Sequence, residues 1–174
     1  MSIVDDKLQA LRTALFSRQR KGGAILLIYP PADEREFRRK YDEVIQELAV
    51  RHVPTEVVDL RLLVFEALEE KGLLERVLKL DAEGSADAAK SLANLTQREA
   101  ERRVLTVAER SPEAVIMCRH TAALFPWISY SALLDAVENV VQNTLVVPFP
   151  GTESGPALHF LGVKDGYNYR AARI

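Results

Sequence analysis

The stretch GGAILLIYPPADEREFRRKYDEVIQELAV, residues 22–50, decides the fold of this chain. Its apolar run over residues 24–29 is too short for a buried helix and is bounded by glycines and prolines, so it predicts a central strand. Asp33 and Glu36 match a capping box, in which the aspartate accepts from a backbone N–H and the glutamate reaches back. The apolar residues behind them recur at helical spacing and predict a helix over residues 34–50. A buried strand followed by an amphipathic helix is typical of an α/β fold.

The rest of the chain continues this alternation in both directions. Apolar spacing predicts an opening helix over residues 3–17 and a long helix over residues 128–142. Further helices are predicted over residues 60–70, 73–80 and 96–110, the last beginning at a second capping box of Thr96 and Glu99. Residues 81–95 predict a loop with marginal helix. Short strands are predicted over residues 55–59, 114–118 and 144–149, and the helices between them favour βαβ crossovers and a parallel sheet.

The closing stretch, FPGTESGPALHFLGVKDGYNYRAARI at residues 149–174, predicts a β-meander. Pro150-Gly151 and Asp165-Gly166 are turn dipeptides, and strands are expected over residues 157–163 and 167–174. These strands should extend the sheet antiparallel and tie the segment into it. We therefore expect one α/β domain over residues 1–174. It has a mainly parallel central sheet flanked by helices, Rossmann-like in three layers, with a C-terminal antiparallel extension.

Composition and charge narrow the classes of function. The chain has 174 residues, of which 48% are apolar and 28% charged, as in ordinary globular proteins. No apolar run approaches the roughly 20 residues of a membrane span, and the acidic opening MSIVDDKLQ is unlike a signal peptide, which predicts a cytoplasmic protein. With 23 Lys and Arg against 25 Asp and Glu, the formal charge of −2 argues against nucleic-acid binding by this chain alone.

The loop after the first strand lacks the features of a phosphate cradle. Pro30 and Pro31 have no backbone N–H to offer an anion, and Asp33 takes the position that the anion would occupy. The GTESG segment at residues 151–155 has glycines but no following lysine, and it joins two strands. The α/β fold is therefore predicted without a phosphate loop.

The residues that could carry catalysis do not form a known pattern. Cys118 lacks an arginine six residues later, where Leu124 stands, and a neighbour such as Arg119 should point to the opposite face of the strand. The histidines His52, His120 and His159 share no metal-ligand spacing. We expect a buried, inert Cys118, no catalytic, cofactor or metal site, and a protein that is not an enzyme.

Aromatic and arginine side chains suggest a partner surface instead, because Tyr, Trp and Arg dominate protein interfaces. The alternative is that part of this set simply covers the core. The candidate residues are Trp127, Tyr130, Tyr167, Tyr169, Arg170 and Arg173.

Three segments carry a resemblance to a known family. They are IYPPADEREFRRKYDEVIQEL at residues 28–48, VVDLRLLVFEALEEKGLLERVLKL at residues 57–80, and the closing stretch with its FPG and YNYRAARI elements. Together they resemble the BrxB family of the BREX bacteriophage-exclusion systems. The resemblance implies a component of a multi-protein defence assembly with an ATPase, a DNA methyltransferase and the phosphatase-like PglZ. It implies other BREX proteins as partners, PglZ foremost, and no catalytic activity is established for the family as a class.

Two other interpretations stay open. A degenerate nucleotide-binding or nucleic-acid-sensing domain would place its ligand at the carboxyl ends of the parallel strands. Self-association through an exposed sheet edge would give a homodimer.

Overall fold

The computed structural model describes residues 2–17, 22–167 and 171–174. In chain order its helices and strands are α1 (Ile3–Phe16), β1 (Gly23–Tyr29), α2 (Glu34–Val50), β2 (Thr55–Asp59), α3 (Leu63–Glu70), α4 (Leu74–Ala82), α5 (Ala86–Arg110), β3 (Val115–Arg119), α6 (Tyr130–Glu138), β4 (Thr144–Ser154), β5 (Ala157–Phe160), β6 (Val163–Tyr167) and β7 (Ala172–Arg173). Short 3₁₀ helices follow β1 at Pro31–Asp33 and β3 at Thr121–Leu124. No helix in these ranges is long and apolar enough to cross a membrane.

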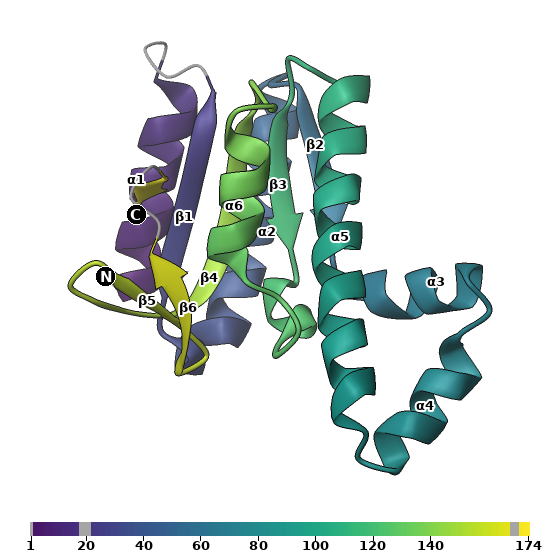
Figure 1. Cartoon of the computed structure of the whole chain (residues 1–174). Helices are drawn as coiled ribbons and strands as arrows, with labels where there is room; N and C mark the ends of the chain where they lie inside the picture. Colours follow the sequence, from purple (N-terminus) through teal and green to yellow (C-terminus); the bar gives the residue numbers. More distant parts are fainter. Residues whose placement is uncertain (1, 18–21, 168–170) are drawn as a thin grey trace.

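A parallel sheet forms the centre of the molecule, as predicted. Its strand order is β2-β3-β4-β1-β7, and every pair along this path is parallel. Helices α1 and α2 cover one face of the sheet, and α5 and α6 cover the other (Figure 1). Alternate residues of β1 serve the two faces: Ile25, Leu27 and Tyr29 pack toward α1 and α2, while Leu26 and Ile28 pack toward α5 and α6.

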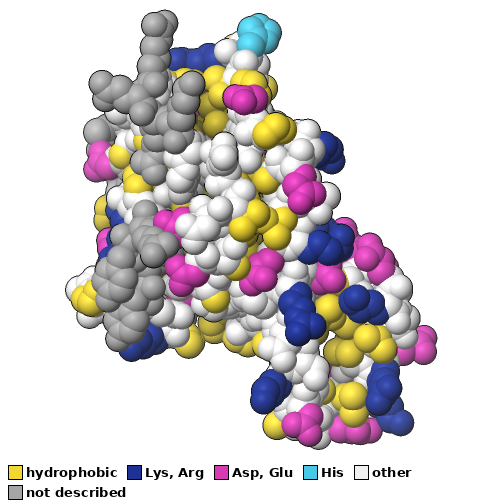
Figure 2. All heavy atoms as spheres, turned by 45° about the horizontal axis from the view of Figure 1, so that its top comes forward, with side chains coloured by type: hydrophobic (Ala, Val, Ile, Leu, Met, Phe, Trp, Pro, Cys, Tyr) yellow, Lys and Arg dark blue, Asp and Glu magenta, His cyan; other side chains and the backbone are white. Residues whose placement is uncertain are grey.

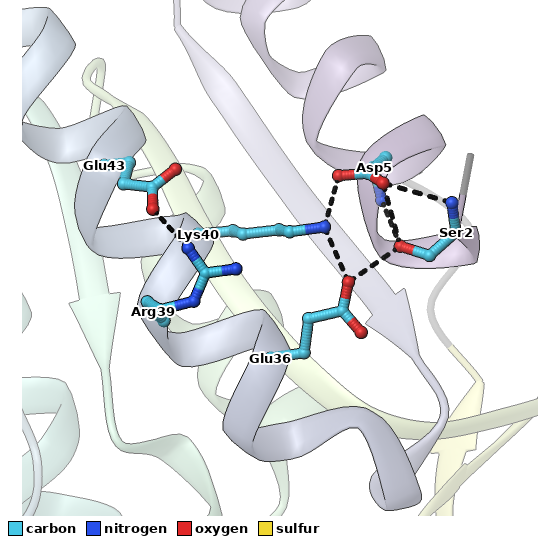
Figure 3. A network of polar contacts seen from close by, with 6 residues as sticks. All are labelled: Ser2, Asp5, Glu36, Arg39, Lys40 and Glu43. Carbon is cyan, nitrogen blue, oxygen red and sulfur yellow. Dashed lines mark hydrogen bonds and ion pairs between the residues drawn. The ribbon is translucent and has the colours of Figure 1, made fainter.

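A polar network joins α1 to α2 (Figure 3). Ser2 and Asp5 form a capping box at the start of α1, and Lys40 Nζ lies 2.5 Å from Asp5 Oδ1 and 2.6 Å from Glu36 Oε1. The capping box predicted for Asp33 and Glu36 is wrong, because the side chain of Asp33 makes no capping hydrogen bond. Glu36 instead accepts hydrogen bonds from Lys40 and from the Ser2 hydroxyl.

Helix α5 is longer than its sequence suggests. It runs unbroken from Ala86, where Ser85 caps it by accepting from the Ala88 N–H. The loop with marginal helix predicted over residues 81–95 is thus confined to residues 83–85, and the helix after it is regular. Thr96 is not a helix start: it is fully buried inside α5, and its hydroxyl donates to the Leu92 carbonyl at 2.8 Å. Packing against α3 and the sheet therefore overrides the weak helix signal of this polar stretch.

Helix α6 is shorter than predicted. It begins at Tyr130, after the Ser129 cap, and ends at Glu138; beyond it the buried Asn143 donates its side-chain amide to the Ser111 and Ala114 carbonyls.

Strand β4 runs straight through the predicted Pro150-Gly151 turn. Its first part pairs parallel with β1 up to Pro150, and from Gly151 onward it pairs antiparallel with β5. A Cβ on Gly151 would lie 2.1 Å from the backbone oxygen of His159. Glycine is required here by close strand approach rather than by a turn.

The C-terminal extension is a hairpin whose strands have other bounds than those predicted. An antiparallel extension is present as predicted, but the single strand predicted over residues 157–163 was wrong: the chain turns at Leu161-Gly162, and β5 and β6 on either side pair antiparallel with each other. Asp165-Gly166 was predicted as a turn but lies inside β6. The final strand, β7, returns to the main sheet and pairs parallel with β1, whereas an antiparallel strand was expected; residues 168–170 lie outside the described ranges.

Candidate functional site

A cleft of about 890 Å³ lies at the carboxyl ends of the parallel strands. Arginines enter it from three places: Arg35, Arg38 and Arg39 from α2, Arg61 from the segment after β2, and Arg119 from the end of β3. Ligands of open α/β sheets bind at this edge, and small-molecule sites typically measure about 300–1,000 Å³. We call this region the arginine cleft.

An aromatic stack underlies the arginine cleft. The rings of Tyr29 and Phe37 are parallel, with centroids 3.7 Å apart, and the Tyr41 ring follows 5.3 Å from that of Phe37. All three side chains are buried. The Tyr29 hydroxyl donates to the Glu34 carboxylate. Burial and the neighbouring carboxylate raise the pKa of Tyr29, so its hydroxyl stays protonated and acts as a donor. The stack gives the arginines a rigid support.

Three of the cleft arginines have carboxylate partners. Arg119 binds Asp42 at 2.8 Å, Arg39 binds Glu43 at 2.7 Å, and Arg61 binds Asp59 at 3.2 Å. Arg35 and Arg38 are exposed on α2, and neither has an ion-pair or hydrogen-bond partner among the residues that the structure describes. The cleft therefore holds two free guanidinium groups beside three that are already engaged.

The end of β3 is held in an uncommon conformation. His120 has φ +57° and ψ +39°, a left-handed backbone that non-glycine residues rarely adopt. Its ring Nδ1 lies 2.9 Å from Asp59 Oδ1. Burial opposes ionisation of Asp59, but the Arg61 backbone N–H and His120 outweigh it and lower the pKa of that carboxyl. Thr121, which follows, is 2% exposed and also lines the cleft.

Cys118 is not part of the cleft. It is fully buried on the α5 and α6 side of the sheet, and burial raises the pKa of its thiol to about 12. Arg119 reaches Asp42 of α2 on the other side, so the predicted divergence of these neighbours is confirmed. The predicted burial of Cys118 is confirmed, and its inertness stays a prediction.

The residues predicted as a partner surface lie in different environments. The prediction that Tyr130 belongs to a partner surface is wrong. Tyr130 is fully buried, and its hydroxyl donates to the Thr121 carbonyl at 2.7 Å, so it cannot face a partner. Trp127 is half-buried and lines a second cleft of about 350 Å³ beside α5 and β6. Arg173 pairs with Glu153 at 2.9 Å. Tyr167 ends β6, and Tyr169 and Arg170 lie outside the described residues.

The helical arm contains a groove that the sequence patterns did not predict. Helices α3, α4 and the first half of α5 form this arm, which projects from the sheet (Figure 1). Figure 2 shows hydrophobic side chains gathered in it, with charged side chains around them. The groove measures about 510 Å³, and its apolar lining is Leu68, Leu73, Val77, Leu80, Leu92 and Leu95. The sequence did contain an indication of this groove, because leucines are frequent in residues 73–80 although α4 contributes no fully buried residue to the core. We call it the arm groove.

These features define a class: an α/β protein with a parallel sheet, no phosphate loop after its first strand, and an open apolar groove on a helical arm. The family model for BREX protein BrxB matches residues 56–174, and the chain belongs to the BrxB family. It is therefore a component of a BREX phage-defence system. No curated protein and no solved structure matches the chain. The match covers the arm groove and the C-terminal hairpin, whereas Arg35 and Arg38 precede it.

Proposed function

We propose that this chain is a non-catalytic adaptor of the BREX assembly, and that it binds the phosphatase-like PglZ protein through the arm groove. The observation that carries the proposal is the arm groove itself. Family membership supplies the set of candidate partners, and PglZ is the first of them to test.

The arm exposes more apolar surface than its own packing requires. Helix α4 has no fully buried residue, and the arm leaves Leu62, Phe65, Leu73 and Leu78 between 37% and 54% exposed. Of these, Leu73 lines the arm groove, and an apolar groove rimmed by polar groups is typical of protein interaction sites. Lys71, Arg76 and Asp87 supply the polar rim.

The shape of the arm groove favours a helical segment as its occupant. Two helices, α4 and α5, form its walls, and an amphipathic helix laid between them would place residues at helical spacing against Leu73, Val77 and Leu92. Apolar contacts at the centre and charged contacts at the rim are the usual arrangement of such interfaces.

Trp127, in the second cleft, is proposed as a separate contact. Trp127 combines a half-buried ring with an open cleft, whereas Arg173, on β7, pairs with Glu153. This surface is independent of the arm groove and can be tested with its own variant.

The test is co-purification with tagged PglZ, followed by an affinity measurement. Leu73→Glu in the arm groove should weaken binding at least tenfold, since a charge would replace an apolar side chain that lines the groove and is 37% exposed. Val140→Glu is the matched control, because Val140 is 66% exposed and lies outside the arm. Both sites are on the surface, so both variants should keep the fold.

Each result has a distinct meaning. Equal loss of binding in both variants, or no loss in either, would overturn the arm groove as the contact. A Val163→Glu variant beside Trp127 that alone abolishes binding would move the contact to the second cleft. A chain that associates with no BREX component would overturn the adaptor function.

A further inference from the structure

The geometry points to a ligand site in the arginine cleft: it binds a small phosphorylated molecule of nucleotide size through side-chain guanidinium groups. This function is separate from the adaptor role, because the cleft lies at the sheet edge and the arm groove lies among α3, α4 and α5.

Unpaired positive charge is the first argument. Arg35 and Arg38 stand one helical turn apart on α2, both exposed and both without a carboxylate partner among the described residues. Arg61 is paired, but its side chain is 61% exposed and it shares Asp59 with His120. A guanidinium fork matches the oxygens of a phosphate in a bidentate manner, so these three arginines form a suitable receptor.

A buried hydroxyl group on the wall of the arginine cleft also supports a ligand there. Thr121 is only 2% exposed, and within the described ranges its hydroxyl has no hydrogen-bond partner. Buried hydroxyls are normally satisfied, so an unpaired one at a cleft wall suggests a missing acceptor or donor. His120, directly before it, holds a strained left-handed backbone, and such strain is concentrated at ligand sites.

The mode of binding follows from the loop after β1. Pro30 and Pro31 cannot donate backbone hydrogen bonds, so the phosphate is held by arginine side chains from α2 and from the β2 and β3 ends. The site is thus an alternative to a glycine-rich loop at the same edge of the sheet.

Size and charge favour a small ligand over a nucleic acid. The volume of about 890 Å³ suits one nucleotide. Asp42, Glu43 and Asp59 accompany the arginines, and the whole chain carries a formal charge of −2. A polynucleotide needs a longer run of uncompensated positive charge along its backbone.

The experiment is thermal denaturation and calorimetric titration of the full chain with ATP, with pyrophosphate and with a 20-nucleotide single-stranded DNA. At 100 times its dissociation constant, a bound ligand should raise Tm by about 5–10 °C. Arg35→Gln/Arg38→Gln should weaken ATP or pyrophosphate binding at least tenfold. The control Arg76→Gln/Arg98→Gln removes the same charge from two exposed arginines elsewhere that have no partner among the described residues, and it should bind as the wild type.

A second variant tests the buried hydroxyl. Thr121→Val keeps the shape of the side chain and should weaken the same ligand while preserving the Tm of the free protein. The proposal is overturned if neither ATP nor pyrophosphate binds at 10 mM, if the arginine variant and its control bind equally, or if only the DNA binds. Co-purification of the arginine variant with PglZ should be unchanged, so failure here and failure of the adaptor role are distinguishable.

Discussion

The carboxylate of Asp165, on strand β6, caps helix α6 at Ser131. Its Oδ2 accepts hydrogen bonds from the Ser131 backbone N–H and hydroxyl, each at 2.8 Å, and its Oδ1 accepts from the Tyr130 N–H at 3.1 Å. The hairpin is therefore fastened to the main domain by a helix cap that comes from outside the helix.

Asp165→Ala should lower the free energy of unfolding by about 1–2 kcal/mol, because it leaves the first N–H groups of α6 without their acceptor. Asp135→Ala, at an exposed position on the same helix, is the control and should change it by less than about 0.5 kcal/mol. Chemical denaturation measures both. Equal effects would show that the cap contributes nothing.

Gly151→Ala should destabilise the protein by about 1–3 kcal/mol, because the added Cβ would meet the His159 backbone oxygen at 2.1 Å and the Phe149 ring at 2.8 Å. Gly72→Asn is the comparison: that site is open and has φ +64°, which asparagine tolerates. A Gly151→Ala protein as stable as the wild type would contradict the close approach of β4 and β5.

Lys40→Met should lower Tm at neutral pH by at most about 4 °C, because the contacts are at the surface. Hydrogen bonds from Lys40 and from the Ser2 backbone lower the pKa of Asp5 from 3.8 to about 2, and those from Lys40 and Ser2 also lower the pKa of Glu36. A carboxyl with a lowered pKa stabilises the fold above its ordinary pKa, and this contribution is lost as pH falls through the folded value.

The difference in Tm between wild type and Lys40→Met should therefore shrink as the pH falls from about 4 to about 2. Lys79→Met, which removes an exposed lysine from α4, should show no such convergence. A gap that stays constant over this range would argue against the network of Figure 3.

Cys118 should resist alkylation and thiol-exchange reagents at pH 8 in the folded protein, because it is fully buried and its pKa is raised to about 12. It should react at once in denaturant. Rapid labelling under native conditions would show that the sheet opens around β3.

A chain that ends at Ala171 should be less stable by about 1–3 kcal/mol and should aggregate more readily. The Ile28 N–H donates to the Ile174 carbonyl at 2.9 Å, and the Ile174 N–H donates to the Leu26 carbonyl at 3.0 Å, so truncation leaves an apolar strand edge unpaired. Light scattering and Tm test this, with Arg173→Ala as the control that keeps the backbone. Truncation after Lys164 would be less informative, because it also removes the Asp165 cap.

Local patterns were sufficient for the parallel core. Strand β2 and helix α2 have the bounds that their sequences predict, because apolar periodicity and flanking breakers act within one element. Pro150-Gly151 and Asp165-Gly166 were wrongly predicted as turns, because each dipeptide favours a turn when taken alone. In the structure, pairing with β1 and β5 decides the conformation of Pro150-Gly151, and the capping of α6 by Asp165 holds the second dipeptide. Long-range pairing is not visible in a dipeptide.

The candidate sites were harder to predict than the fold. Arg35 and Arg38 look in sequence like a solvated helix face, and only the register of β2 and β3 brings Arg61 and Arg119 beside them. Tyr130 was expected at the surface from its type and its position between a strand and a helix, but its ring packs edge-on against Phe160 at 5.0 Å. Side-chain type alone could not separate core from interface here.

The pairing of β1 with β7 also has a consequence for the order of folding. In the sheet β1 lies between β4 and β7, and both neighbours come late in the sequence. Contacts between residues so far apart in the sequence form slowly. Both edges of β1, an unbroken run of apolar residues, therefore stay unpaired until β4 and β7 are available. The earliest strand of the domain is thus the last to be completed, and it is where misassembly during synthesis or refolding should begin.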